Sequence, residues 1–332
     1  MSPPRPRSHA LAARALGLLL GVAADAILGD PARHHPVAWF GSWAARVERP
    51  LHADRTTRGA SFTVVALTPV VLLGVAAERV ARRRPLAHTA VTALATWAVV
   101  GSRSLAREGD AMAAALASEA LDAARARLTH LCGRDPSALD AAELGRATVE
   151  SLAENTADAA VASLFWGALL GVPGLLLHRG ANTLDAMVGH RNARYRRFGT
   201  ASARLDDALD LVPARVTGAL ACALAPLVGG SPRRAWRTML RDAHDHPSPN
   251  GGWCEAAWAG ALGVRLGGVN TYGDRVEVRG TLGDPDAPRP DAAAVRGAAR
   301  LVTAVTGAAT LIAAAALIIP LPTTTPTRRT CP

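Results

Sequence analysis

The stretch ALAARALGLLLGVAADAIL, residues 10–28, determines the fold class. It carries only two charged side chains, Arg14 and Asp25, and it approaches the roughly 20 apolar residues that a helix needs to cross a bilayer. Five more apolar stretches follow, at 61–77, 86–101, 159–177, 211–229 and 299–320. We therefore expect an all-α polytopic membrane protein with four to six membrane segments. It would form one domain over residues 1–320 and end in a disordered tail at 321–332.

Composition and charge fit this class and argue against others. The 332 residues are 49% hydrophobic but only 4% aromatic, and the formal net charge of +10 comes entirely from arginine, because the chain has no lysine. The arginines flank apolar stretches, for example at 79–84, as in the cytoplasmic loops of membrane proteins. They form no patch interleaved with aromatic residues, so we expect no nucleic-acid partner. The four cysteines lack CxxC spacing and predict neither a zinc site nor a disulfide framework.

Four polar stretches separate the apolar ones, at 29–60, 102–157, 178–210 and 230–298. If all six apolar segments crossed the membrane, the second and third polar stretches would face opposite sides, although both are rich in arginine and acids. Segment 159–177 contains GVPG, and 211–229 contains Pro213 and Pro226. Interrupted helices occur at membrane depth where they are buried or line a cavity. We therefore predict that some segments are re-entrant, so that the polar stretches meet at the cytoplasmic face of the cell membrane.

Within the polar stretches, apolar residues at helical spacing predict helices across 102–157, broken after Gly133. Ser137 is a candidate N-cap for the second of these helices. The segment DRVEVRGTL at 274–282 alternates as a strand does, and 283–291 is typical of a linker.

The segment ESLAENTAD, residues 150–158, holds three carboxylates at four-residue spacing. Glu150, Glu154 and Asp158 share one face of a predicted helix, where like charges repel unless a cation lies over them. Mg²⁺ takes carboxylate oxygens and completes its shell with water and substrate phosphates, so this face is a candidate metal site, with Asn155 beside it. The alternative is a solvated acidic face neutralised by arginines such as Arg146.

The segment NTLDAMVGHRNARYRRFG, residues 182–199, is a second polar cluster. Asn182 and Asp185 are three residues apart and share a helical face, and His190 is a candidate general acid or base because its pKa lies near neutral pH. A histidine at a helix end is otherwise a surface or capping residue. The arginines that follow could bind phosphate or serve as a positive flank of a membrane segment: Arg191, Arg194, Arg196 and Arg197.

Two further groups of acids lie near apolar segments. Asp206, Asp207 and Asp210 stand immediately before the apolar residues at 211–229, where an acid is costly enough to indicate a partner or an ion. Asp25 lies inside the first apolar segment and is a functional candidate for the same reason.

The stretch RDAHDHPSPNGGWCE, residues 241–255, offers acids and histidines in an irregular loop. Asp242, His244, Asp245 and His246 have ligand chemistry, but we do not expect a metal there, because the loop around them has no regular spacing. Asparagine and glycine in the following turn tolerate positive φ. The chain contains no GxxxxGK[ST], GxSxG or HExxH motif, so a P-loop, a serine hydrolase and a zinc protease have no support.

Collinear segments across residues 15–320 resemble the CobD/CbiB family of cobalamin biosynthesis. They are LGDPARHHPVAWFG (28–41), AREGD (106–110), ESLAENTADAAVASLFW (150–166), NTLDAMVGHRNARYRRFG (182–199), ARLDD (203–207) and HPSPNGGWCEAAWAGALGVRLGGVNTYG (246–273). The resemblance implies adenosylcobinamide-phosphate synthase activity. This reaction joins the free propionate of adenosylcobyric acid to (R)-1-amino-2-propanol, or to its O-phosphate, as an amide. The resemblance also implies ATP and Mg²⁺, and contact with other late cobalamin-pathway enzymes.

The same resemblance suggests roles for residues at the matching positions. Glu150, Glu154 and Asp158 would bind the metal and ATP, with support from Asn155. Asn182, Asp185 and His190 would surround the reacting carboxylate, with Asp185 or His190 as the base for the amine. Further binding roles fall to Arg191 and Arg204 for phosphate, and to His246, Ser248, Asn250 and Glu255 for aminopropanol or the corrin side chains.

The main alternative is a polytopic transporter or a membrane regulatory protein of the AmpE type. A transporter would carry acids in the middle of most membrane segments, whereas here the acids concentrate in the polar stretches. A regulator without enzymatic activity has little need of three carboxylates at four-residue spacing.

Overall fold

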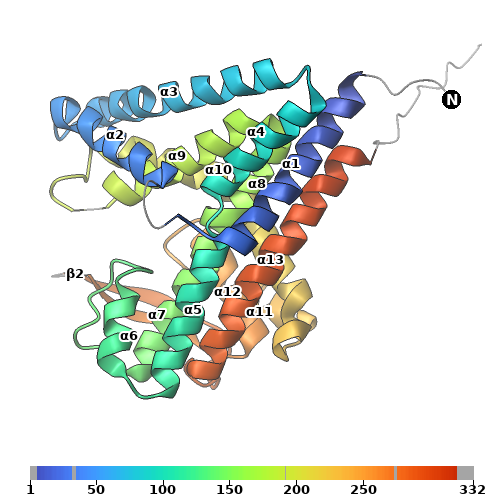
Figure 1. Ribbon diagram of the computed structural model, residues 1–332. Helices are drawn as coiled ribbons and strands as arrows, with labels where there is room; N and C mark the ends of the chain where they lie inside the picture. Colours follow the sequence, from blue (N-terminus) through green and yellow to red (C-terminus); the bar gives the residue numbers. More distant parts are fainter. Residues whose placement is uncertain (1–5, 32–34, 191, 273–274, 320–332) are drawn as a thin grey trace, which may run out of the picture.

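The computed structural model describes residues 6–31, 35–190, 192–272 and 275–319, and it is almost entirely helical (Figure 1). The α-helices are α1 (Pro6–Leu28), α2 (Pro36–Leu51), α3 (Thr56–Ala81), α4 (Pro85–Val99), α5 (Ser102–Ala117), α6 (Leu121–Leu128), α7 (Ala141–Thr156), α8 (Ala162–Leu170), α9 (Val172–Val188), α10 (Thr200–Leu224), α11 (Pro232–Asp242), α12 (Gly251–Leu262) and α13 (Ala292–Ile318). The other elements are the π-helical turn η1 (Ala157–Val161), 3-10 turns at Ala225–Val228 and Ala243–Asp245, and an antiparallel hairpin of β1 (Leu266–Tyr272) and β2 (Arg275–Leu282).

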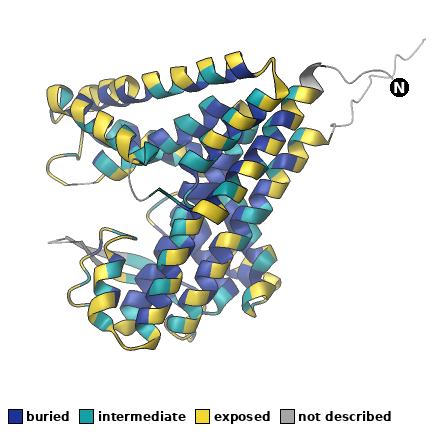
Figure 2. Ribbon diagram, in the orientation of Figure 1, coloured by how far each residue is buried: buried dark blue, intermediate teal, exposed yellow. Residues whose placement is uncertain are grey.

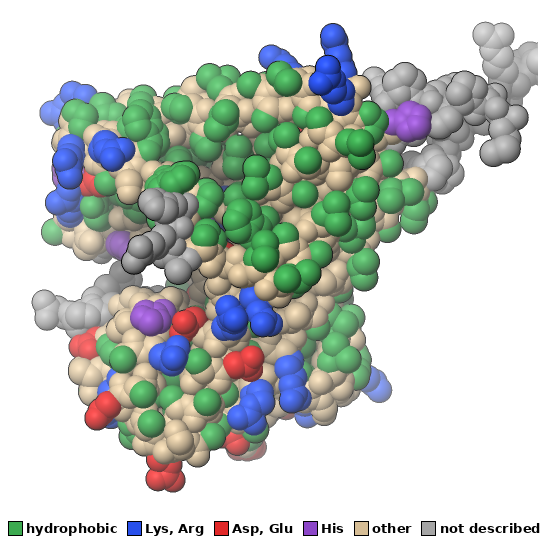
Figure 3. Space-filling view, viewed as in Figure 1, with side chains coloured by type: hydrophobic (Ala, Val, Ile, Leu, Met, Phe, Trp, Pro, Cys, Tyr) green, Lys and Arg blue, Asp and Glu red, His purple; other side chains and the backbone are tan. Residues whose placement is uncertain are grey.

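The helices form two halves that share α13 (Figure 1). In this view α1 to α4 and α8 to α10 lie in the upper half, and α5 to α7, α11, α12 and the hairpin lie in the lower half. Figure 3 shows hydrophobic side chains over much of the upper half, while most of the visible Asp and Glu side chains lie on the lower half. The upper half is therefore the more apolar one, with arginines at its edges, and the lower half carries most of the visible acids.

Four helical segments of the described chain are long and apolar enough to cross a membrane: His9–Leu28, Thr56–Ala81, Thr200–Val228 and Ala292–Ile318. Large apolar side chains on them are exposed at the protein surface, as at Leu20, Leu72 and Leu311, and Figure 2 shows such exposed positions along α3. Contiguous apolar surface of this kind is unfavourable in water and suits a lipid environment. The chain is an all-α polytopic membrane protein, which confirms the predicted fold class.

The other two predicted membrane segments are shorter helices. Residues 86–101 form α4, whose 15 residues span about 22 Å, less than the roughly 30 Å of a bilayer core. Residues 159–177 are divided at Gly171, which has a φ of 74° and separates α8 from α9. The predicted interruption is therefore present in this segment.

The interruption predicted in 211–229 is absent at Pro213, and this part of the prediction is wrong. α10 continues from Thr200 to Leu224 through the proline. Proline has no N–H, so the carbonyl of Leu209, four residues earlier, loses its helical donor. The indole Nε1–H of Trp166 donates to that carbonyl instead, at 2.9 Å. With its backbone satisfied in this way, the helix needs no break.

Close packing and buried polar contacts hold the upper half together. Gly17 and Gly21 of α1 face Thr92 and Thr96 of α4, and a side chain at either glycine would collide with the facing threonine. This spacing of small residues lets two helices approach closely, as is common in membranes.

The two acids buried within the first two spans have structural partners. Glu78 of α3 accepts hydrogen bonds from Arg14 at 2.8 Å and from the N–H of Val172 at 3.1 Å, so it ties α1 to the start of α9. Asp25 accepts the N–H of Arg103 at 3.0 Å and thereby caps α5. Asp25, a functional candidate from the sequence, therefore contributes to the fold.

The lower half departs from one sequence prediction and confirms another. The N-cap of α7 is Asp140, which forms a capping box with Glu143, so the prediction of Ser137 is wrong. A carboxylate followed three residues later by glutamate satisfies two free N–H groups at once, which serine at 137 could not do. The strand predicted at 274–282 is confirmed as β2, and its partner β1 follows the left-handed Gly263, which ends α12.

Candidate active site

A cavity of about 200 Å³ lies where α7, η1, α9, α10 and α12 meet. Its wall includes Glu154, Asp158, Asp185, Asp206, Asp207 and Asp210, together with Ser248, Asn250 and Cys254. The predicted polar stretches 102–157 and 178–210 therefore meet at one site, and the stretch 230–298 closes it. The cavity is strongly acidic, since six carboxylates border a volume that suits only a small group.

Asp158 reaches this cavity through an irregularity in its helix. η1 is a π-helical turn between α7 and α8, in which the N–H of Ala162 donates to the carbonyl of Ala157, five residues earlier. Single π-turns are rare in proteins and are frequent at functional sites. The side chain of Asp158 forms hydrogen bonds with Asp210 and Asn182, and burial together with Asp210 raises the pKa of Asp158 well above its usual value.

The aspartates of α10 are backed by a buried histidine. Asp206 and Asp210 stand four residues apart and are 9% and 3% exposed. The ring of His178 lies between two partners, with Nε2 2.8 Å from Asp210 Oδ1 and Nδ1 2.9 Å from the hydroxyl of Ser163. Ser163 and His178 are completely buried and do not line the cavity. They therefore act on the cavity from behind its wall, by the contact of His178 with Asp210 and by its electrostatic interaction with Asp158.

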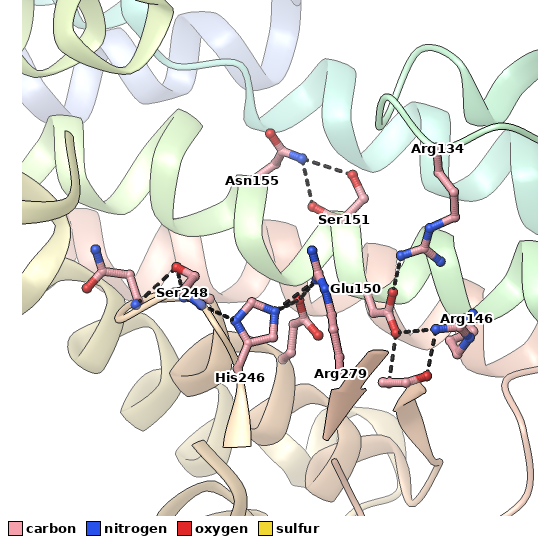
Figure 4. A network of polar contacts seen from close by, with 12 residues as sticks. Arg134, Arg146, Glu150, Ser151, Asn155, His246, Ser248 and Arg279 are labelled. Carbon is pink, nitrogen blue, oxygen red and sulfur yellow. Dashed lines mark hydrogen bonds and ion pairs between the residues drawn. The ribbon is translucent and has the colours of Figure 1, made fainter. Parts of the chain in front are cut away.

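Glu154 belongs to a second buried group, with Glu255, His246 and Arg279. His246 Nε2 lies 3.2 Å from Glu255 Oε1, and a guanidinium nitrogen of Arg279 lies 3.5 Å from the same oxygen. Burial, followed by the charge of a second glutamate, raises the pKa of Glu154 and of Glu255 to about 8. His246 Nδ1 accepts the N–H of Ser248, and a guanidinium nitrogen of Arg279 lies 2.9 Å from His246 Nε2 (Figure 4).

Glu150 lies outside the cavity, so the three predicted metal ligands do not form one site. Figure 4 shows Arg134 and Arg146 on its carboxylate, at 2.6 and 3.3 Å, and the N–H of Gly267 also donates to it at 2.8 Å. Arg146 in turn donates to the carbonyls of Gly267 and Val269. Glu150 therefore anchors the β-hairpin to α7. The alternative from the sequence, an acidic face neutralised by arginines, named a correct partner in Arg146. The ion pair is buried, however, and not solvated.

The remaining predicted catalytic and binding residues divide into two groups. Asp185 lines the cavity, and Asn182 supports Asp158 from behind. Asn155 instead donates to the carbonyl and hydroxyl of Ser151 one turn earlier on α7. His190 and Arg204 are exposed and absent from the cavity wall, and Arg191 lies outside the described residues, as does the tail at 321–332.

The turn before α12 shapes one wall of the cavity. The hydroxyl of Ser248 accepts the N–H groups of Asn250 and Gly251, and Asn250 donates to the carbonyl of Asp207 at 2.8 Å. These contacts fix the turn against α10. In the preceding loop, Asp242 pairs with Arg241, and the rings of His244 and Trp253 meet edge to face. His246 instead joins the group of Glu154 and Glu255, whose ligand atoms lie within 4.8 Å of one another.

The sequence reasoning missed His178, Ser163, Arg134 and Arg279. His178 follows an apolar run, and nothing in its spacing connects it with Asp210, 32 residues later. Arg134 and Arg279 lie in a loop and a strand whose contacts depend on the tertiary fold. The signal that the sequence did offer was Asp206 and Asp210 at the edge of an apolar segment.

Comparisons with known proteins agree with this description. The family model described as CobD/Cbib protein matches residues 18–302. The "Cobalamin biosynthesis protein CobD" of Mycobacterium tuberculosis (strain ATCC 25618 / H37Rv) is 50% identical over 277 residues, which cover 83% of this chain and 88% of that protein. The protein of the same name from Geobacter metallireducens is 42% identical over 290 residues, covering 86% and 91% of the two chains. No solved structure matches the chain. The chain therefore belongs to the CobD/CbiB family of cobalamin-biosynthesis proteins.

Proposed function

We propose that this protein is an adenosylcobinamide-phosphate synthase. It would use ATP to join the free propionate of adenosylcobyric acid to (R)-1-amino-2-propanol, or to its O-phosphate, as an amide. The observation that carries the proposal is the acidic cavity, whose wall holds six carboxylates and no activated nucleophile in the described residues.

The two side chains of the wall that could act as nucleophiles are both unsuitable. Cys254 is buried, and burial beside several carboxylates raises the pKa of its thiol well above the usual value. The hydroxyl of Ser248 accepts two backbone N–H groups, and among the described residues it donates to no base. A covalent acyl-enzyme therefore has no support, and the propionate needs activation from outside the protein. ATP would transfer a phosphoryl group to the carboxylate, and the amine would then displace phosphate from the acyl carbon.

The cavity fits the Mg²⁺ that this chemistry uses. Its donors are carboxylate oxygens, which are the ligands that Mg²⁺ prefers, and Glu154 and Asp158 are placed to hold such an ion. Mg²⁺ would neutralise the phosphate charge that the acidic wall otherwise repels.

The amine needs a base, and Asp185 is better placed than His190. Asp185 lines the cavity, and its pKa is raised by burial and by Asp207, which makes its carboxylate a stronger proton acceptor. His190 is exposed and outside the wall. In this scheme, attack of the amine on the acyl carbon releases a proton, which Asp185 takes.

The size of the cavity suggests how the substrates bind. A volume of about 200 Å³ holds a three-carbon amino alcohol with a bound ion, but neither a corrin ring nor a whole nucleotide. The macrocycle would therefore remain outside and insert only its propionate arm. We place this entrance on the cytoplasmic side of the cell membrane, where ATP is available.

The test is to incubate membranes containing the protein with adenosylcobyric acid, aminopropanol phosphate or free aminopropanol, and Mg-ATP. Mass spectrometry should detect the amide product, and ATP should be consumed with it. If this protein forms no amide while another family member is active in the same assay, the proposal is overturned.

A second experiment tests the role of the cavity. Glu154→Gln should abolish turnover while the protein still inserts into the membrane, because the amide cannot supply a charged ligand. Asp110→Asn, an exposed change on α5, is the matched control and should leave turnover unchanged. Near-normal turnover in Glu154→Gln would remove this carboxylate from the reaction.

A third experiment tests the topology. Reporter fusions in the polar stretches 102–157 and 178–210 should both report the cytoplasm, since both stretches border one cavity. Readouts on opposite sides would refute the cytoplasmic site.

A further inference from the structure

The aspartates at the α10 side of the cavity form a group of their own. Oxygen or nitrogen atoms of His178, Asp206 and Asp210 lie within 4.8 Å of one another, and Asp158 reaches Asp210 from η1. Three carboxylates are thus gathered at one end of the cavity. Among the described residues, no arginine forms a salt bridge within 4.0 Å to any of the three, in contrast to Glu150.

Asp206 gives an independent indication that something binds there. Its side chain is nine-tenths buried and lines the cavity, yet Oδ1 has no hydrogen-bond partner in the described part of the protein. A buried carboxylate oxygen without a donor is costly, and native proteins rarely leave one without a ligand, an ion or water. The oxygen is therefore available to a ligand in the cavity. Arg179 already places one positive charge near Asp158 and Asp206, and a cation in the cavity would balance the remaining negative charge.

His178 is better suited to orient a ligand than to be one. Both ring nitrogens are engaged, since Nδ1 faces the hydroxyl of Ser163 and Nε2 faces Asp210. The consistent arrangement has the serine hydroxyl donating to Nδ1 and Nε2–H donating to the carboxylate. Outer partners of this kind hold a metal-binding carboxylate in one orientation.

We propose that Asp158, Asp206 and Asp210 form a binding site for a hard divalent cation such as Mg²⁺ or Mn²⁺, with the Ser163–His178 pair positioning Asp210. The open coordination positions face the cavity and would take water or a substrate oxygen. The sequence indicated a partner or an ion near Asp206 and Asp210 without giving them a ligand role, and it did not single out His178. The site shares Asp158 with the ion of the proposed function, but its test needs neither ATP nor a corrinoid.

The experiment measures Mn²⁺ binding to the purified full-length protein in detergent, without nucleotide or corrinoid, by the loss of the electron paramagnetic resonance signal of free Mn²⁺. The protein should bind Mn²⁺, and Mg²⁺ should compete for the same site. Asp206→Asn should weaken binding by about 100-fold or more, whereas the exposed control Asp110→Asn should bind as the original chain does. A chain that binds no Mn²⁺, or an Asp206→Asn variant with unchanged affinity, would overturn the proposal.

Two variants of His178 test the positioning role. His178→Leu should weaken Mn²⁺ binding by about 10- to 100-fold, the usual effect of losing an outer partner. His178→Gln keeps an N–H donor toward Asp210 and should restore part of the affinity. Equal affinities in all three proteins would show that His178 only fills space. If Asp206→Asn fails to fold, judged by circular dichroism and gel filtration, Asp158→Asn provides the same test from η1.

The outcomes separate this site from the proposed function. A protein that binds Mn²⁺ through Asp206 but forms no amide keeps the cation site and refutes the synthase. A protein that forms the amide while Asp206→Asn binds Mn²⁺ normally keeps the synthase and refutes the site.

Discussion

Glu150 and Asp206 are both buried carboxylates in the same protein, but their surroundings are opposite. Glu150 is 2% exposed, and two arginines and a backbone N–H donate to its oxygens. Asp206 is 9% exposed, stands one helical turn from Asp210, and keeps one oxygen without a partner in the described structure. The hydrogen bonds of Glu150 are therefore complete, whereas those of Asp206 are not.

The difference distinguishes structure from function among acids that look alike in the sequence. A buried charge with a full set of donors stabilises the fold, or at least one arrangement of it, and has nothing left to offer a ligand. A buried carboxylate facing other carboxylates is unfavourable while all of them are charged, and it gains when a proton or a cation neutralises the group. The Glu150 region thus holds the hairpin against α7, and the Asp206 region has the features of a binding site.

The same chemical change at both positions tests this contrast, and Glu150→Gln should have the largest effect on stability. The amide would leave Arg134 and Arg146 buried without their counter-charge. Removing one member of a buried ion pair costs about 3–5 kcal/mol in free energy of unfolding. Thermal unfolding of the detergent-purified protein should show this loss both with Mg²⁺ and with a chelator.

Glu143→Gln, a glutamate to glutamine change at a half-buried position on the same helix, is the control for Glu150→Gln. It should lose only the weaker half of a capping box, well below the loss at Glu150. If the two variants unfold at similar temperatures, the arginine network around Glu150 contributes little to stability.

The sequence predicted the membrane class, the family and most of the carboxylates of the cavity, because hydropathy and local motifs depend on neighbouring residues. It misassigned Glu150, because i, i+4 spacing puts Glu150 and Glu154 on one helical face without showing what covers each position. Arg134, from the loop before α7, covers Glu150, whereas Glu255, from α12, faces Glu154. The π-turn at Asp158 and the link from His178 to Asp210 likewise arise only in the folded chain.

A smaller effect is expected at the start of α7, the helix that carries Glu150 to one region and Glu154 to the other. Asp140 accepts the N–H of Glu143 at 2.7 Å, and loss of an N-cap costs about 1 kcal/mol. Asp140→Ala should lower the free energy of unfolding by that amount, whereas Ser137→Ala should leave it unchanged. Equal losses of free energy of unfolding in the two variants would mean that Ser137 also caps the helix and that the helix begins earlier.

The smallest expected change in the free energy of unfolding is that of Asp206→Asn under chelation. It should be a gain, whereas Glu150→Gln should cause a loss. In the presence of a chelator, Asp206→Asn removes one of two like charges at i, i+4 spacing on α10 and should raise the free energy of unfolding by roughly 0.2–0.5 kcal/mol. In saturating Mg²⁺ the order should reverse, because the original chain gains stability from the bound ion and the variant does not. Thermal unfolding of both proteins across a Mg²⁺ titration measures the crossing. Two parallel curves, or a loss of stability in Asp206→Asn under chelation, would mean that Asp206, like Glu150, is held by the protein itself.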